Sequence, residues 1–352
     1  MNYWVSVVFR AIPLAMMAVC IGFGAYIWTA GDSAGNFVAG HVVVFLGAIC
    51  VCLFCTAATI IRQLIGRFNT LDKFLYPALG FITAAGTAAY GIIIFAGAAP
   101  ERPDDYVAGH VVFGLGLISG CVAAVATAST KFTLVPQNSQ LPDSDRSRPG
   151  SAFSGTSTLV LYAIPVVLAG TAWTFAIIDL AQASTPERFT VGHVMSGLAM
   201  ICTSLIGLVF SIVRQVQNTY EPRERILWPA LVIAMGTLST IWGVVVLGLH
   251  SEKYYLTPGF VMIGLGLVCF SILSKVGLLA LVWRRTFELA NRVPLIPVVT
   301  ALACLFLSAF VFQMAVDDSS VFIAARVLVG LGGICFTLYS IVSILESGTS
   351  TE

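Results

Sequence analysis

Long apolar stretches, separated by polar segments that are mostly short, run along the whole chain. Each stretch holds about 20 residues, the length that a helix needs to cross the roughly 30 Å hydrocarbon core of a bilayer. The pattern predicts ten membrane-spanning helices, at residues 8–28, 38–61, 75–98, 107–130, 157–180, 190–213, 227–249, 257–276, 295–316 and 322–345. We therefore expect an all-α, polytopic membrane protein.

A short pattern built on the letters GHV recurs in every second span. Three copies carry a histidine at their one polar position, as in VAGHVVVFLGAI from residue 38: His41, His110 and His193. Two weaker copies carry Phe260 and Arg326 there. Because the copies fall in alternate spans, the sequence predicts five pseudo-repeated helical hairpins. Glycines follow in each copy, so we expect the second helices to form an inner, closely packed layer.

One long polar stretch divides the chain. It covers residues 137–157 and is rich in Ser, Pro and Asp, which is typical of a flexible linker. We predict a four-span unit of two hairpins before it, a second such unit after it, and a final hairpin with a tail, at 1–136, 158–292 and 293–352. Residues 276–292 turn from apolar to basic and amphipathic, and we expect them to prolong the eighth span and bend into the interface.

Basic residues are distributed unevenly between the loops on the two sides of the membrane. Loops after odd-numbered spans contain Arg102, Arg188 and Lys253, beside acidic residues. Loops after even-numbered spans contain twelve basic residues: Arg62, Arg67, Lys73, Lys131, Arg146, Arg148, Arg214, Arg223, Arg225, Arg284, Arg285 and Arg292. Because basic loops remain in the cytoplasm, this asymmetry predicts that both termini are cytoplasmic.

The composition excludes several classes of protein. The chain is 58% hydrophobic and 10% charged, with a mean hydropathy of +0.94 and a net charge of +1, so it offers no basic surface for nucleic acid. All nine cysteines lie inside apolar runs, including the CxxC spelling at Cys52–Cys55, and we interpret them as packing residues. The sequence contains no phosphate-binding loop, nucleophile triad or HExxH motif. We expect no catalytic residues, no cofactor and no metal, and therefore not an enzyme.

The repeated histidines are the first candidates for chemistry. Each lies 21 residues before a basic residue, a helical rise of about 31 Å, which places the histidines at the outer, periplasmic boundary. Histidine titrates near pH 6.5, so one hypothesis is a pH-responsive collar around a common axis, with Arg326 as a permanent charge at the fifth position. The alternatives are a packing role, with imidazole hydrogen-bonded to the backbone of a neighbouring first helix, and zinc binding, which no spacing within one helix supports.

Three carboxylates at the same boundary extend this candidate site. Asp317 and Asp318 lie a short turn before Arg326 and are predicted to pair with it, and Asp179 lies at the outer end of the fifth span. Charged side chains at this boundary commonly extend to the aqueous interface and have no further role. The alternative is that these residues line an ion path. No carboxylate falls at the midplane of a predicted span, which argues against a proton-coupled pump.

Several stretches of the chain resemble one known family. The VAGH repeats, the pairs Arg62–Gln63 and Asn69–Thr70, and the late segments LALVWRRTFELANRVPLIPV and RVLVGLGGICFTLYSIVSILE look like the YhiM family. Members of this family are enterobacterial-type inner-membrane proteins of a domain of unknown function. The resemblance covers the whole chain. It implies a bacterial inner membrane and a role in acid and stress tolerance, and it brings no catalytic residues.

Two functional hypotheses follow from these observations. The leading one is a channel-like or transporter-like protein that supports acid tolerance, passes an ion or small solute and is controlled by the periplasmic histidines. The rival is a non-transporting scaffold or stress sensor that binds a protein or lipid partner. A continuous polar cavity along the second helices would favour transport, and a dry, glycine-packed centre would favour the scaffold. Five hairpins can close a ring within one chain, and a homo-oligomer is also compatible with the sequence.

Overall fold

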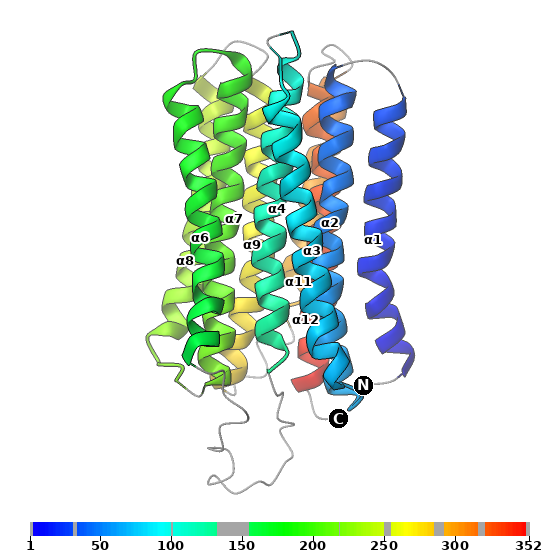
Figure 1. Cartoon of the computed structure of the whole chain (residues 1–352), viewed down its shortest axis with the longest axis vertical. Coiled ribbons are helices and arrows are strands. Elements are labelled where there is room, and N and C mark those ends of the chain that lie inside the picture. Colours follow the sequence, from blue (N-terminus) through cyan, green and yellow to red (C-terminus); the bar gives the residue numbers. More distant parts are fainter. Residues whose placement is uncertain are drawn as a thin grey trace, which may run out of the picture.

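The computed structural model is a bundle of long helices that run side by side (Figure 1). It describes residues 3–30, 34–99, 101–131, 155–217, 219–249, 255–284, 292–315 and 321–349. The helices in these ranges are α1 (Tyr3–Thr29), α2 (Ala34–Leu64), α3 (Thr70–Ala96), α4 (Pro103–Ser129), α6 (Gly155–Ala181), α7 (Pro186–Val216), α8 (Glu224–Leu249), α9 (Leu256–Arg284), α11 (Leu295–Met314) and α12 (Phe322–Thr349). All ten are long and apolar enough to cross a membrane, and no strand occurs in the described ranges. The predicted all-α fold with ten spans is confirmed.

The helices form two layers. In the inner layer, α2, α4, α7, α9 and α12, between 72% and 94% of the residues in the apolar part are buried. In the outer layer, α1, α3, α6, α8 and α11, the share is 17% to 33%. Each outer helix packs against the inner helix that follows it in the chain, and the inner helices contact one another in the order α2, α4, α7, α9, α12 and back to α2. The inner layer is therefore a closed ring of five helices.

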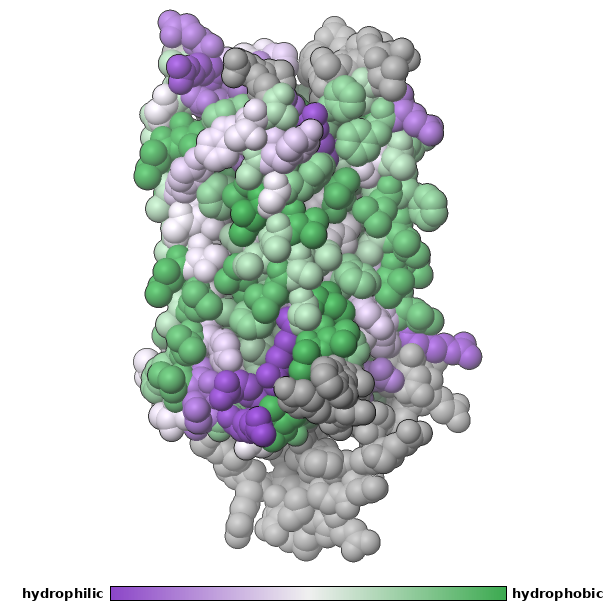
Figure 2. All heavy atoms as spheres, turned by 90° about the vertical axis from the view of Figure 1, so that its right-hand side faces the viewer, coloured by the Kyte–Doolittle hydropathy of each residue, from purple (hydrophilic) through white to green (hydrophobic). Residues whose placement is uncertain are grey.

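The outer helices present large apolar side chains at the surface of the bundle. Phe74, Ile82 and Phe306 are 71%, 70% and 75% exposed. Figure 2 shows apolar residues covering the middle of one face of the bundle, with hydrophilic residues gathered toward its two ends. An apolar surface of this extent is unfavourable in water, so we interpret it as the surface that faces lipid.

Glycines bring the two layers into close contact. A Cβ atom at Gly91 of α3 would lie 2.4 Å from the backbone nitrogen of Phe113 in α4. A Cβ atom at Gly109 of α4 would lie 2.5 Å from the backbone nitrogen of Phe95 in α3. Neither space admits a methyl group. Small residues thus set the distance between an outer and an inner helix, as is common between membrane helices.

The inner helices begin earlier than the hydrophobic pattern predicts. Helices α2, α4 and α7 start at Ala34, Pro103 and Pro186, so each repeated histidine lies seven residues after a helix start, in the second turn. Proline suits the first positions of a helix, because its missing N–H would have no intrahelical partner there. At the start of α7, Thr185 also caps the helix, since its side chain accepts from the backbone N–H of Arg188.

Other predicted boundaries fall partly outside the described residues. Helix α9 continues to Arg284, so the first part of 276–292 prolongs the eighth span as expected, whereas 285–291 lie outside the description. The predicted linker at 137–157 also lies largely outside it, and its last three residues belong to α6. The five-hairpin repeat and the unit boundaries stay predictions.

The two ends of the bundle are distinct. Helix α1 begins and α12 ends at the same end (Figure 1), which we call the termini end. The opposite end, where α2, α4 and α7 begin, is the histidine end. At the termini end, two ion pairs connect inner helices to the outer helices that follow them: Arg62 Nε lies 2.8 Å from Asp72 Oδ2, and Arg214 Nε lies 3.2 Å from Glu224 Oε1. Which end faces the cytoplasm stays a prediction.

Candidate functional site

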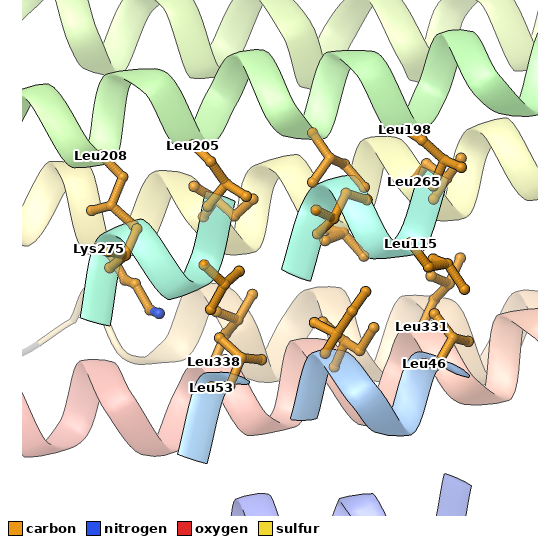
Figure 3. Close-up of a pocket in the computed structure, with 18 residues that line it drawn as sticks. Leu46, Leu53, Leu115, Leu198, Leu205, Leu208, Leu265, Lys275, Leu331 and Leu338 are labelled. Atoms are coloured by element: carbon orange, nitrogen blue, oxygen red, sulfur yellow. The ribbon is translucent and has the colours of Figure 1, made fainter. Parts of the chain in front are cut away.

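The ring of inner helices encloses a narrow axial cavity (Figure 3). Its wall is built from side chains that recur every three or four residues on each inner helix, and this spacing places them on one helical face. Three successive layers of five aliphatic side chains make up most of the wall. They are Leu46, Leu115, Leu198, Leu265 and Leu331; Ile49, Ile118, Ile201, Val268 and Ile334; and Leu53, Val122, Leu205, Ile272 and Leu338. We call the first set, nearest the histidine end, the leucine layer.

Most side chains of the leucine layer pack against a glycine of a neighbouring inner helix. Four contacts link successive inner helices in this way: Leu198 on Gly114, Leu265 on Gly197, Leu331 on Gly264 and Leu46 on Gly330. A Cβ atom at Gly330, for example, would lie 2.4 Å from Cδ1 of Leu46. Because each leucine occupies the space above a glycine, the inner helices approach closely and aliphatic groups fill the axis.

A second cavity continues this path toward the termini end. Val125, Leu208 and Lys275 line both cavities, so the two are contiguous, and Thr56 and Ser129 add hydroxyl groups to the second. The cavity volumes are about 30 Å³ and about 20 Å³. Volumes of this size hold at most a few water molecules, and the aliphatic part of the wall offers water no hydrogen bonds. The path is therefore closed by aliphatic side chains, which is one way in which channels are gated.

Lys275 is the one charged residue among the described residues that line these cavities. It lies on α9 and is 3% exposed, and its ammonium group has no hydrogen-bond or ion-pair partner within the described ranges. Figure 3 shows its side chain among those of the lining leucines. The hydrophobic pattern places Lys275 at the end of the eighth span and assigns it no role. The apolar run 276–283 that follows it is the signal that it lies inside a helix.

The three histidines do not face this path. His41, His110 and His193 are 2%, 4% and 5% exposed. Each precedes a member of the leucine layer by five residues, a turn of about 140° around the helix, so its ring points away from the axis. The geometry differs from the predicted collar around a common axis: the rings pack between the inner and the outer layer.

Each of the three rings makes the same type of hydrogen bond within its own helix. Nδ1 of His41, His110 and His193 donates to the carbonyl four residues earlier in the same helix, at 2.8, 2.9 and 2.7 Å. The ring of His41 also lies 4.3 Å from that of Trp28 in α1, and its Nε2 accepts from the Tyr90 hydroxyl of α3 at 3.1 Å. These contacts support a packing role, although the backbone acceptor lies in the histidine's own helix and not in a neighbouring first helix as predicted. A pH response stays a prediction.

Asp179 joins the surroundings of His110. Its Oδ1 accepts a hydrogen bond of 2.5 Å from the Tyr106 hydroxyl of α4, and the Tyr106 ring lies 4.2 Å from that of His110. Asp179 is 2% exposed, and its Oδ2 has no hydrogen-bond partner in the part of the chain that the structure describes. An acid, a phenol and an imidazole thus meet between α4 and α6 near the histidine end, a connection that sequence spacing does not reveal.

Arg326 lies where the ring of inner helices closes. Its guanidinium donates to the side chain of Asn36, so it connects α12 to α2, and it lies 5.4 Å from the centre of the Phe322 ring. The predicted partners Asp317 and Asp318 are outside the described residues. Within the described ranges, no three His, Cys, Asp or Glu side chains group closely enough to hold a metal ion.

These features define a helical membrane protein with ten spans, in which five inner helices enclose a closed and largely apolar path. The chain belongs to the family described as "Protein of unknown function (DUF2776)", which matches residues 1–350. It is 44% identical to "Inner membrane protein YhiM" of Escherichia coli (strain K12) over 352 residues, which cover all of both chains. The predicted resemblance is confirmed, and the chain is a homologue of an inner membrane protein. No solved structure matches it.

Proposed function

We propose that the chain is a channel-like or transporter-like protein of the inner membrane, and that its permeation path follows the axial cavities. The observation that carries this proposal is the pair of contiguous cavities enclosed by a closed ring of five membrane-spanning helices. In the present state the aliphatic layers close the path. A small outward movement of the inner helices would admit water between the leucines, because hydrophobic constrictions conduct once they are wetted.

In this proposal, the three histidines at the histidine end control whether the path is open. His41 contacts α1 and α3, His110 stacks on Phe95 of α3, and His193 faces Trp242 of α8. Protonation would therefore place charge at contacts that hold outer helices against the inner ring. Histidine titrates near pH 6.5 in its unperturbed state, so acid would loosen these contacts. The resemblance to an acid-stress family supports a role in acid and stress tolerance.

Ion flux into proteoliposomes tests the proposal. External pH is lowered from about 7.5 to about 4.5 for the wild type and for a variant with glutamine at all three histidines. We expect an acid-dependent flux that the histidine variant loses. A pH response that survives in that variant would reject the histidine control and leave the path in place.

A substitution in the leucine layer tests the path itself. Leu198→Ser should raise flux by about tenfold, which requires a barrier lower by about 1.4 kcal/mol. Removing one buried leucine changes the hydrophobic free energy by about 1.5–3 kcal/mol. This change is large enough to lower the barrier by the required amount. Leu238→Ser on the outer helix α8, where the leucine is 44% exposed, is the matched control and should leave flux unchanged.

A non-transporting scaffold or stress sensor is the second candidate. The small volume and mainly aliphatic walls of the axial cavities favour it, although the centre is filled by leucines and not by glycines alone. In this case the wild type and folded Leu198→Ser would both be silent for every ion tested, at every pH. That outcome would reject the channel and favour a role in binding a protein or lipid partner.

A further inference from the structure

We infer that Lys275 forms a binding site for a small inorganic anion, of the size and charge of a halide, where the two axial cavities meet. The site would make the path selective for anions, and this second statement rests on the proposed function. The binding of the anion does not depend on conduction, so the two ideas can fail separately.

The position of Lys275 is the first argument. Its side chain belongs to the wall of both cavities, on the axis that all five inner helices share. Any ion that moves along this axis must pass it. The side chain is 3% exposed and lies within an otherwise aliphatic wall, so its charge is little screened by water.

The missing counter-charge is the second argument. No carboxylate is among the described residues that line either cavity. At the termini end, Asp72 and Glu224 are already paired with arginines, and Glu346 lies one residue beyond the lining residue Leu345. A buried and unpaired ammonium group is unfavourable, so it either gives up its proton or takes up an anion.

The two hydroxyl groups that line the second cavity already donate to backbone carbonyls, so Lys275 is the donor that remains for a ligand. Thr56 donates to the carbonyl of Cys52 at 3.2 Å, and Ser129 donates to the carbonyl of Val125 at 2.7 Å, each within its own helix. Their hydrogens are therefore committed to backbone. The ammonium group of Lys275 has three donors and no partner within the described ranges, which is the arrangement that an anion requires.

The size of the cavities limits the ligand. Volumes of about 30 Å³ and about 20 Å³ correspond to a few water molecules. A monatomic anion fits such a space, whereas a carboxylic acid with a carbon skeleton or a phosphate ester does not. The aliphatic layers on the histidine-end side offer no hydrogen bonds, so a weakly hydrated anion such as bromide should bind at least as well as chloride.

Thermal unfolding of the purified protein in detergent tests the binding. The probe is sodium chloride or sodium bromide, compared with sodium gluconate at the same ionic strength. A ligand that binds only the folded state raises Tm in a saturable manner. We expect such a rise for the wild type and for Lys275→Arg, which keeps the charge, and its loss in Lys275→Met, which keeps the length of the side chain. Lys73→Met, at an exposed lysine of α3, should behave as the wild type.

The same variants in flux measurements separate the two ideas. Chloride flux in the Leu198→Ser background that falls at least tenfold on adding Lys275→Met would support an anion path. Equal halide-dependent shifts in Tm for the wild type and Lys275→Met would overturn the site. Cation flux that is insensitive to Lys275→Met would overturn anion selectivity and leave the channel intact. A halide shift lost in Lys275→Met, with no flux in any variant, would establish the site and reject the channel.

Discussion

Replacing Gly91 by alanine is expected to destabilise the protein by about 2 kcal/mol, because α3 and α4 touch at this residue. The new Cβ atom would lie 2.4 Å from the backbone nitrogen of Phe113, where ordinary contacts begin at 3.4 Å. The obstacle is backbone and cannot rotate away, so the two helices must separate by about 1 Å. Overpacking of this kind costs about 1–3 kcal/mol, and a rigid neighbour places the cost near the upper figure. Alanine recovers about 1 kcal/mol as a better helix former.

Gly86→Ala is the matched control, in the same helix. Gly86 is exposed, and an added Cβ atom there meets nothing within 4 Å. Both variants have the same gain in helix propensity, so the difference between them, about 3 kcal/mol, isolates the collision. Unfolding in mixed micelles, followed by loss of helical circular dichroism, measures both free energies. Equal stability of the two variants would refute the close approach of α3 and α4.

Three further predictions concern one hydrogen bond, one ion pair and the burial of the cysteines. Tyr106→Phe removes the donor to Asp179 and leaves a buried carboxyl group without a partner, so the free energy of unfolding should fall by about 1–3 kcal/mol; an unchanged value would contradict the burial of that bond. Asp72→Ala breaks the ion pair with Arg62 and one half of the capping box at the start of α3, and should cost about 1 kcal/mol in the same assay. All nine cysteines are buried and unpaired, so a charged maleimide should label none in the folded protein and all after denaturation; rapid labelling of the native state would contradict the packing.

The pattern of apolar stretches was sufficient to predict the number and type of the helices. A spanning helix must satisfy its backbone hydrogen bonds internally and expose apolar side chains over about 20 residues, and both requirements are local. The family resemblance could be predicted for the same reason, since it depends on letters and not on contacts. The inner position of the second helices followed from their glycines, which permit close approach only where another helix is near.

The direction in which each inner helix faces was decided by the tertiary structure. A helix that is apolar on all sides has no hydrophobic periodicity to indicate its core face. The histidine, the most conspicuous polar residue of α2, α4 and α7, therefore drew the prediction of an axial collar, although the axis is faced by the leucine layer five residues later. Once the ring of five helices closes, this offset alone turns the histidines toward the outer helices.

The role of Lys275 and the partner of Asp179 also depended on contacts between distant segments. In the sequence, Lys275 resembles any lysine near the end of a span, because its burial is created by residues of the other four inner helices. Tyr106 and Asp179 are 73 residues apart, and no spacing rule connects them. The sequence by itself determined that the chain crosses the membrane in ten helices. Only their packing around one axis decided which side chains meet there, because a residue's neighbours across helices are set by the closure of the ring and not by its own helix.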